Sequence, residues 1–312
     1  YGKLTNEIGY INLSSFTENC ADDFQSALLS LKADKINSLV IDLRGNPGGL
    51  LLQSVDIVNL FVPKDVEVVS TKGKYRQFDN SFKTRKEALD TEIPVVVIVN
   101  ENSASASEIV SGAMQDLDRA VVIGSRTFGK GLVQTTRDIA YNTKLKLTTS
   151  KYYIPSGRCI QALDYSHRKN DGSVEKISDS LITAYKKKNG RTVFDGAGIS
   201  PDIAVETEKY PLCIEELIKQ NFIFDFATMY CIANQSIETP EKFEVNDDIF
   251  NSFKDYCIKR KFSYDNEIEK EIKNIEKLVT QKANYSSISE ELKSLSTELL
   301  KIKSTELDEN KK

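Results

Sequence analysis

Short apolar runs separated by glycine-rich turns dominate the first two thirds of the chain. Two of these runs lead directly into stretches, at 49–62 and 103–117, whose apolar residues recur at helical spacing. Strands that alternate with helices in this way are typical of a layered α/β fold. Four runs have the length and the β-branched content expected of strands: 38–43, 94–100, 120–124 and 146–153.

The pattern changes twice further along the chain. Residues 164–198 are polar and rich in glycine, so we expect a long surface excursion before the short strand pattern ISPDIAV. After about Pro211 glycine disappears and apolar residues recur at helical intervals. We therefore predict two domains, an α/β core over 1–208 and a helical module over 209–312. The module has two apolar stripes, Ile268, Ile272, Ile275 and Val279, then Leu292, Leu295, Leu299 and Ile302. They span too few heptads to require a coiled coil, which favours a helical accessory module that packs on the core.

Composition narrows the range of partners. The chain of 312 residues has 42 Lys and Arg against 46 Asp and Glu, a formal charge of −4. This charge is too mild and too evenly mixed to capture nucleic acid or an anionic membrane. No apolar run is long enough to cross a membrane, and the opening residues lack a signal-peptide pattern. We expect no membrane span in this chain, while an export signal upstream of it can have been removed.

Histidine and cysteine restrict the chemistry further. His167 is the one histidine, so a multi-histidine metal site cannot form, and a catalytic imidazole would have to be this one. It lies in the polar stretch SHRKNDGS, where a loop would orient an imidazole poorly. The five cysteines are widely spaced and form no CxxC pair, which favours buried thiols over a zinc cluster or a disulfide framework. We expect neither a metal nor another cofactor.

Two turns between a strand and a helix can carry chemistry. The segment 43–49 (LRGNPGG) has two adjacent glycines whose N–H groups can approach a reacting carbonyl, although a plain tight turn also explains them. The segment 102–108 (NSASASE) reads as an ordinary helix cap, because serine followed by glutamate is capping chemistry. A serine here can instead be a nucleophile whose next N–H points at an oxyanion. The familiar GxSxG signature is missing.

A third turn, 124–131 (GSRTFGKG), matches seven of the eight positions of a phosphate-binding P-loop. The eighth should be Ser or Thr to hold magnesium and is Gly131, and the following LVQTTRDI has no helical apolar face. Nucleotide binding is therefore a distant alternative. Lys130 is either a surface charge or a base, since a desolvated lysine can lose its proton near neutral pH. A serine nucleophile with a lysine base needs no histidine.

Taken together, four blocks resemble the C-terminal-processing, or tail-specific, serine peptidases: IDLRGNPGGLL, VNENSASASEIVSGAMQD, RTFGKGLVQ and KLTTSKYYIPSGRCIQ. The blocks occur in the family's order over residues 38–161, and GAGISPDI is similar to the family's domain ending. The helical module resembles versions of the family found in Bacteroidetes-like bacteria. The resemblance implies an α/β fold, a mixed sheet with helices layered as in ClpP and crotonase, followed by the helical module.

The resemblance also implies roles for individual residues. Ser105, the middle serine of SASAS, corresponds to the nucleophile, and Lys130 of FGKG corresponds to the general base. Gln134 of GLVQ corresponds to the residue that positions the lysine. The oxyanion hole maps to the N–H groups of Ala106 and of the NPGG turn, with Gly48 as the expected donor.

Asp116 matches a carboxylate that the family often carries. It follows Ser105 by eleven residues, about 16 Å along a helix, so we assign it a structural role with at most an indirect contact to the site.

The implied activity is hydrolysis of extended protein substrates through an acyl-enzyme, without a cofactor, after export to the cell envelope or periplasm. Family members usually carry a PDZ domain before the block EIGYINLSSF, and this chain has few residues there, so delivery of substrate by a PDZ domain stays open. Assembly into a homo-oligomer stays open too. The main alternative is a catalytically inert module that binds peptides on the same fold.

Overall fold

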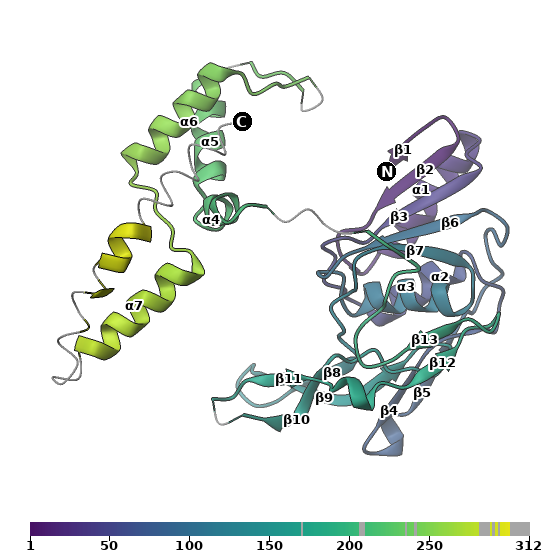
Figure 1. Cartoon of the computed structure of the whole chain (residues 1–312). Coiled ribbons are helices and arrows are strands. Elements are labelled where there is room, and N and C mark those ends of the chain that lie inside the picture. The colour runs from purple at the N-terminus through teal and green to yellow at the C-terminus, as the bar shows by residue number, and fades with distance from the viewer. Residues whose placement is uncertain are drawn as a thin grey trace. The chain divides into compact units, whose positions relative to one another are not determined.

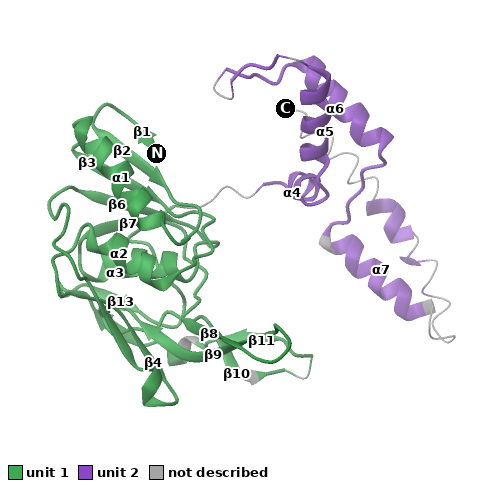
Figure 2. Ribbon diagram, turned by 180° about the vertical axis from the view of Figure 1, so that it is seen from behind, with its two compact units in different colours: residues 1–207 green, residues 208–312 purple. Residues whose placement is uncertain are grey.

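The computed structural model describes two compact units, residues 1–207 and residues 208–312, shown in green and purple in Figure 2. The first unit contains the strands and three helices, and the second is helical. The described residues are 1–169, 171–205, 210–234, 236–239, 242–280, 288, 291–292 and 294–299.

A six-stranded sheet forms one layer of the first unit (Figure 1). Its strands lie in the order β1, β2, β3, β6, β7, β14; β1 is antiparallel to β2, and all other neighbours are parallel. The carboxyl ends of β3, β6 and β7 therefore meet at one edge, where ligands bind in open α/β sheets. The bounds are β1 Gly2–Lys3, β2 Ile8–Asn12, β3 Ser38–Asp42, β6 Val95–Val99, β7 Ala120–Gly124 and β14 Ile203–Ala204.

A second, antiparallel sheet of four strands has the order β5, β4, β9, β8. Its long hairpin, β8 paired with β9, leaves β8 as an edge strand with no neighbour on its outer side in that sheet. An edge strand offers unpaired main-chain groups to another extended chain. The bounds are β4 Glu67–Gly73, β5 Asn80–Lys83, β8 Leu132–Asp138 and β9 Lys144–Tyr153.

Helices α2 (Leu51–Asn59) and α3 (Ala106–Asp116) lie between the two sheets (Figure 1). They contact each other, and both contact β4, while α3 also contacts β7. Every residue of α3 is buried, so this helix has no solvent face, which suits its small residues Ala, Ser and Gly. Helix α1 (Cys20–Ala33) contacts α2 and β2.

Branched apolar side chains from adjacent strands form the core of this unit. Each fully buried side chain of this kind contributes about 1.5–3 kcal/mol. The α/β prediction is confirmed, and the four expected strands correspond to β3, β6, β7 and β9. In the six-stranded sheet, the most buried residues, at most 1% exposed, are Leu39, Ile41, Val97, Val99 and Val122.

The segment 164–198 differs from its prediction as an irregular excursion. It contains two small antiparallel pairs, β10 with β11 and β12 with β13, and the side chains of Lys187 and Val193 are buried. Strands this short and this charged leave no clear alternation in the sequence, so the pattern could not reveal them. The bounds are β10 Leu163–Arg168, β11 Val174–Lys176, β12 Ala184–Lys186 and β13 Thr192–Phe194.

The second unit is helical over its described part, as its sequence predicts. Its small core is aromatic: Phe222 contacts Tyr256 and Phe262 edge to face. The apolar stripe of the last helix is only partly buried, because Ile272 is buried whereas Ile268 is exposed. No described helix is long and apolar enough to cross a membrane. The bounds are α4 Leu212–Lys219, α5 Phe222–Ala233, α6 Asp247–Lys259 and α7 Glu267–Thr280.

Candidate active site

Ser105 occupies the sharp turn between β6 and α3. Its φ of 57° and ψ of −114° lie outside the regions that residues with a side chain ordinarily adopt, so surrounding contacts must hold the turn. Ser103 supplies two of them: its buried hydroxyl donates to the carbonyl of Leu43 (2.8 Å) and accepts from the N–H of Asn100 (2.9 Å). The turn thereby presents the half-buried Ser105 side chain to a pocket.

Gly48 lies directly against the Ser105 turn. A Cβ atom at Gly48 would fall 2.7 Å from Cβ of Ser105 and 2.9 Å from the amide nitrogen of Ala106, and its φ is 97°. Only glycine fits this conformation and this space. The Gly48 N–H donates to Oδ1 of Asn46 (2.9 Å). A substrate oxygen would have to displace that contact or use the N–H of Gly49, which also lines the pocket.

Asn46 fixes the approach of the NPGG turn to α3, and the sequence reasoning missed it. The side chain is fully buried and donates to the carbonyl of Leu13 (2.7 Å). The main-chain carbonyl of Asn46 accepts from the N–H of Ala104 (3.0 Å) and from the hydroxyl of Ser107 (2.9 Å). An amide side chain within a glycine-rich turn was the signal available in the sequence.

Lys130 reaches the same pocket from the loop after β7. The N–H of Phe128 donates to the carbonyl of Ser103 (3.1 Å), which joins this loop to the Ser105 turn. The N–H of Gly131 donates to Oε1 of Gln161 (2.8 Å). Lys130 is half-buried and lines the pocket beside Ser105.

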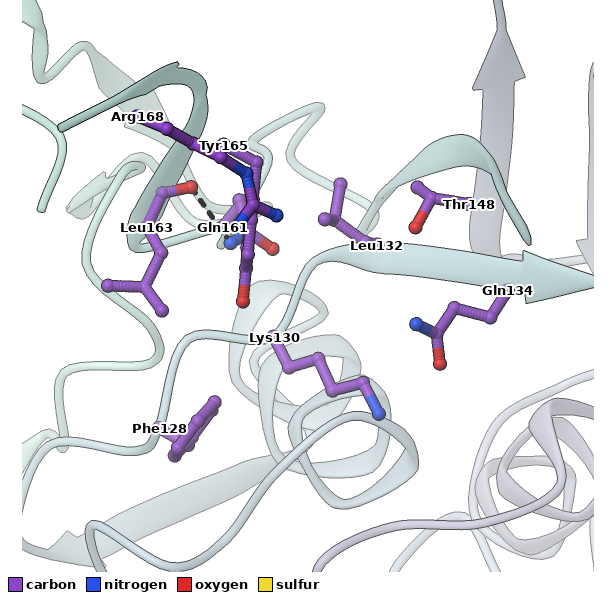
Figure 3. A pocket seen from close by; sticks show the side chains of 9 residues that line it. All are labelled: Phe128, Lys130, Leu132, Gln134, Thr148, Gln161, Leu163, Tyr165 and Arg168. Atoms are coloured by element: carbon purple, nitrogen blue, oxygen red, sulfur yellow. Dashed lines mark hydrogen bonds between the residues drawn. The ribbon is translucent and has the colours of Figure 1, made fainter. Parts of the chain in front are cut away.

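Gln134 lies on β8, beyond Lys130. Both side chains line the pocket, and Figure 3 shows the amine of Lys130 extending toward the amide of Gln134. A P-loop would need a helix directly after its lysine, and β8 occupies that position, as the absence of a helical pattern predicted.

Glu108 joins the Ser105 turn to the loop that carries Lys130 through one carboxylate. The side chain is fully buried, and its Oε1 accepts from the hydroxyl of Thr127 (2.6 Å) and the N–H of Gly129 (2.7 Å). Its Oε2 accepts from the N–H of Ser105 (2.8 Å) and the N–H of Lys130 (2.8 Å). A single oxygen atom therefore binds the main chains of both residues.

The sequence reasoning read Glu108 only as part of a helix cap. Burial raises the pKa of Glu108, and hydrogen bonds from its four donors act in the opposite direction. A charged residue among the small and apolar residues of the first turns of this helix was the signal that it does more than cap.

Tyr152 contacts the carbonyl groups of the same two residues, Ser105 and Lys130. Its ring is buried, and its hydroxyl hydrogen-bonds the carbonyl of Lys130 and lies 3.2 Å from the carbonyl of Ser105. Burial raises the pKa of Tyr152 well above its ordinary value, so the hydroxyl keeps its proton. The N–H groups of Ser105 and Lys130 thus meet at Glu108, and their carbonyls meet at Tyr152.

The pocket that these elements enclose has a volume of about 470 Å³. It brings together four of the residues singled out in the sequence, namely Gly48, Ser105, Lys130 and Gln134. Ala106 is buried at the first position of α3 and does not line the pocket with its side chain. The remaining lining residues are Pro47, Gly49, Leu50, Leu51, Ile109, Leu132, Val133, Lys146 and Tyr152.

Asp116 lies at the other end of α3, away from the pocket-lining residues. It pairs with Arg158 (2.9 Å), and both side chains are 1% exposed. Its second oxygen accepts from the N–H of Ser156 (3.0 Å), and Arg158 also donates to Gln115 (2.7 Å). Removing one member of a buried pair leaves an uncompensated charge, so this pair ties α3 to the segment after β9.

The side chain of His167 lies outside the described part of the structure, so the prediction that its imidazole has no role stays a prediction. Among the described residues, no group of three or more His, Cys, Asp or Glu is placed to hold a metal ion.

Two family models match parts of this chain. Residues 7–166 match the model of peptidase family S41, and residues 213–312 match the C-terminal helical domain of a probable PDZ-protease. A carboxy-terminal-processing protease of Bartonella bacilliformis is 43% identical over 165 residues, 52% of this chain and 38% of that protein. A probable CtpA-like serine protease of Staphylococcus aureus is 35% identical over 210 residues, 67% of this chain and 35% of that protein.

Among solved structures, the photosystem II D1 C-terminal processing protease is similar with a TM-score of 0.49 and 27% identity, covering 68% of this chain and 46% of that one. The chain thus spans well under half the length of the curated relatives named above. A match to the family model over half of the sequence is nevertheless sufficient to place it: the chain belongs to peptidase family S41.

Proposed function

We propose that this chain is a serine endopeptidase of the C-terminal-processing type that hydrolyses peptide bonds of extended protein substrates, with Ser105 as nucleophile and Lys130 as general base. The observation that carries the proposal is the shared pocket of Ser105 and Lys130, whose main-chain N–H groups bind the same oxygen of Glu108. A nucleophile and a base from two different loops need such a common anchor to keep their spacing.

The reaction follows from these positions. The neutral amine of Lys130 accepts the proton of the Ser105 hydroxyl while Oγ attacks the carbonyl carbon of the scissile peptide bond. The negative charge on the carbonyl oxygen is stabilised by N–H donors from Ala106 and from the NPGG turn. The lysine ammonium then donates its proton to the leaving amine, and the C–N bond breaks. Water repeats the sequence on the acyl-enzyme and regenerates the serine.

Substrate binding in extended form is supported by β8. This strand is at the edge of its sheet and contributes Leu132, Val133 and Gln134 to the pocket. A peptide that adds to such an edge gains main-chain hydrogen bonds that do not depend on sequence. We also propose export to the cell envelope, on the family resemblance, and we leave self-association open.

Gln134→Ala should slow hydrolysis without abolishing it, because the amide orients the amine of Lys130 and does not itself take the proton. We expect kcat to fall about tenfold, with KM changed little. Steady-state kinetics on one peptide measures both values. The matched control is Gln77→Ala, since Gln77 is exposed and lies outside the pocket. A fully inactive Gln134→Ala enzyme would instead give Gln134 a direct part in proton transfer.

Glu108→Gln should reduce both stability and turnover. The amide keeps one acceptor oxygen but turns an NH₂ group toward two of the present donors, so at least one buried N–H loses its partner. We expect the free energy of unfolding to fall by about 2–4 kcal/mol, and kcat to fall at least tenfold, because in either orientation the amide loses at least one hydrogen bond that holds the Ser105 turn or the Lys130 loop in place. Chemical denaturation and peptide kinetics measure the two effects.

Glu101→Gln is the control for this variant. Glu101 is exposed and accepts one hydrogen bond, from the hydroxyl of Ser125 (3.0 Å), close to the same loops. We expect it to resemble the wild type. If Glu108→Gln kept full turnover in the folded protein, the shared carboxylate would not be what positions the two residues.

The proposal as a whole is tested by incubating an unfolded protein with the chain and identifying the products by mass spectrometry. New termini should appear, and a serine-reactive organophosphorus probe should block their formation and label Ser105. Binding of the unfolded protein without any new terminus would favour the inert peptide-binding module. A label on another serine would contradict the assigned nucleophile.

A further inference from the structure

A second pocket, of about 660 Å³, adjoins the first one. Lys130, Leu132 and Gln134 line both pockets. The loop that carries Lys130, the proposed base, and the edge strand β8 therefore form a wall that the two pockets share. Leu163, Tyr165 and Arg168 of β10 line the opposite side of the second pocket (Figure 3). A substrate residue seated here would lie close to the scissile bond.

The walls of the second pocket are mostly apolar. Phe128, Leu132, Leu163 and Tyr165 supply the apolar surface. Gln161 is polar, but both ends of its amide are engaged: Oε1 accepts from Gly131, and Nε2 donates to the carbonyl of Leu163 (3.0 Å). The oxygen and the nitrogen of the Gln161 amide are therefore both bonded to the protein's own main chain.

Among the described residues that line this pocket, the charged ones are Lys130 and Arg168, and none is a carboxylate. The guanidinium carbon of Arg168 lies 5.6 Å from the centre of the Tyr165 ring, and Nη1 donates to the carbonyl of Gly172 (3.4 Å). Stacking on an aromatic ring holds a guanidinium in one plane and leaves its other N–H groups for an anion. Figure 3 shows both side chains reaching from β10 over the pocket.

We propose that the second pocket selects substrates that place a carboxylate, attached to an apolar residue or side-chain stem, next to the scissile bond, and that Arg168 binds this carboxylate. The inference rests on the proposed peptidase function and adds the substrate class. The apolar walls take up the hydrocarbon part, and the guanidinium pairs with the charge through N–H donors. The carboxylate can come from the terminal residue of a chain or from an internal Asp or Glu.

The test uses four synthetic peptides built on one sequence that the chain cleaves. The first ends in a free carboxylate close to the scissile bond, and the second ends there in an amide. The third and fourth carry Glu or Gln at the equivalent place within a longer amidated peptide. We expect wild-type kcat/KM to be about tenfold higher for a carboxylate peptide than for its neutral partner. The pair that shows the difference identifies the source of the carboxylate.

Arg168→Gln should remove this preference while leaving cleavage of the neutral peptides unchanged, and the change should lie in KM. Lys169→Gln is the matched control, because Lys169 is the next residue, is exposed, and pairs with Glu175 outside the pocket. Equal cleavage of all four peptides by the wild type would overturn the proposal without any need for a variant. A preference that survives in Arg168→Gln would overturn it as well.

Failure of this proposal can be told from failure of the proposed function. If the wild type cleaves the peptides without regard to charge, only the role of Arg168 is lost. If it cleaves none of them and no unfolded protein either, the peptidase function itself is wrong.

Discussion

Replacing Ser105 with Ala should lower peptide hydrolysis by a factor of about 10³ or more, because the attacking oxygen is lost and the remaining pocket can only bind substrate. The fold should tolerate the change. Alanine keeps the Cβ atom that packs against Gly48, and the main-chain N–H of residue 105 can still donate to Glu108. Kinetics on a peptide and a thermal unfolding curve of the same sample measure the two outcomes.

The neighbouring serines are informative controls, because their hydroxyls point into the fold. The hydroxyl of Ser103 bonds to Leu43 and Asn100, and that of Ser107 bonds to Asn46. Replacing either by Ala should cost about 1–2 kcal/mol of stability and leave an active folded enzyme. Ser105→Ala should therefore lose activity and keep its stability, whereas Ser103→Ala and Ser107→Ala should lose stability and keep activity. A stable but inactive Ser103→Ala or Ser107→Ala protein would show that the nucleophile has been misassigned.

Lys130→Arg should be as inactive as Lys130→Ala, a loss of about 10³-fold or more, although it keeps the positive charge. A guanidinium does not give up its proton, so it cannot accept one from Ser105. For the same reason wild-type activity should rise with pH, since only the neutral amine can act as a base. Initial rates over a range of pH, with unfolding monitored in parallel, measure both effects.

The control for Lys130→Arg is Lys144→Arg on β9, an exposed lysine that pairs with Asp138. It should behave as the wild type. Substantial hydrolysis by Lys130→Arg, or wild-type activity that does not change with pH, would exclude lysine as the base. The imidazole of His167 would then be the alternative candidate for the base.

Much of the fold was readable in the sequence. Short branched apolar runs specify β3, β6 and β7, because residues of this kind gain most when buried in a sheet. The threonines and tyrosines of β9 indicate a strand by their β-propensity. Helices α2 and α3 were also predicted, although they begin two or three residues later than their patterns suggested, since the turns before them take those residues. Helix α1 was not predicted. The pairs β10–β11 and β12–β13 were missed because each strand is too short to show a period.

The sequence by itself also determined which side chains bring chemistry to the site: a serine at a strand-to-helix turn, a lysine between two glycines, and a glycine pair after β3. Only the tertiary structure decided that they share a pocket, because their distance in space depends on the parallel order of β3, β6 and β7. It also decided the roles of Glu108, Tyr152 and Asn46. Their hydrogen-bond partners are 22 residues or more away in sequence in most cases, so no local pattern could specify them. The buried Glu108 carboxylate, which needs donors from both loops to remain in the core, is the physical link that makes one site of two separate motifs.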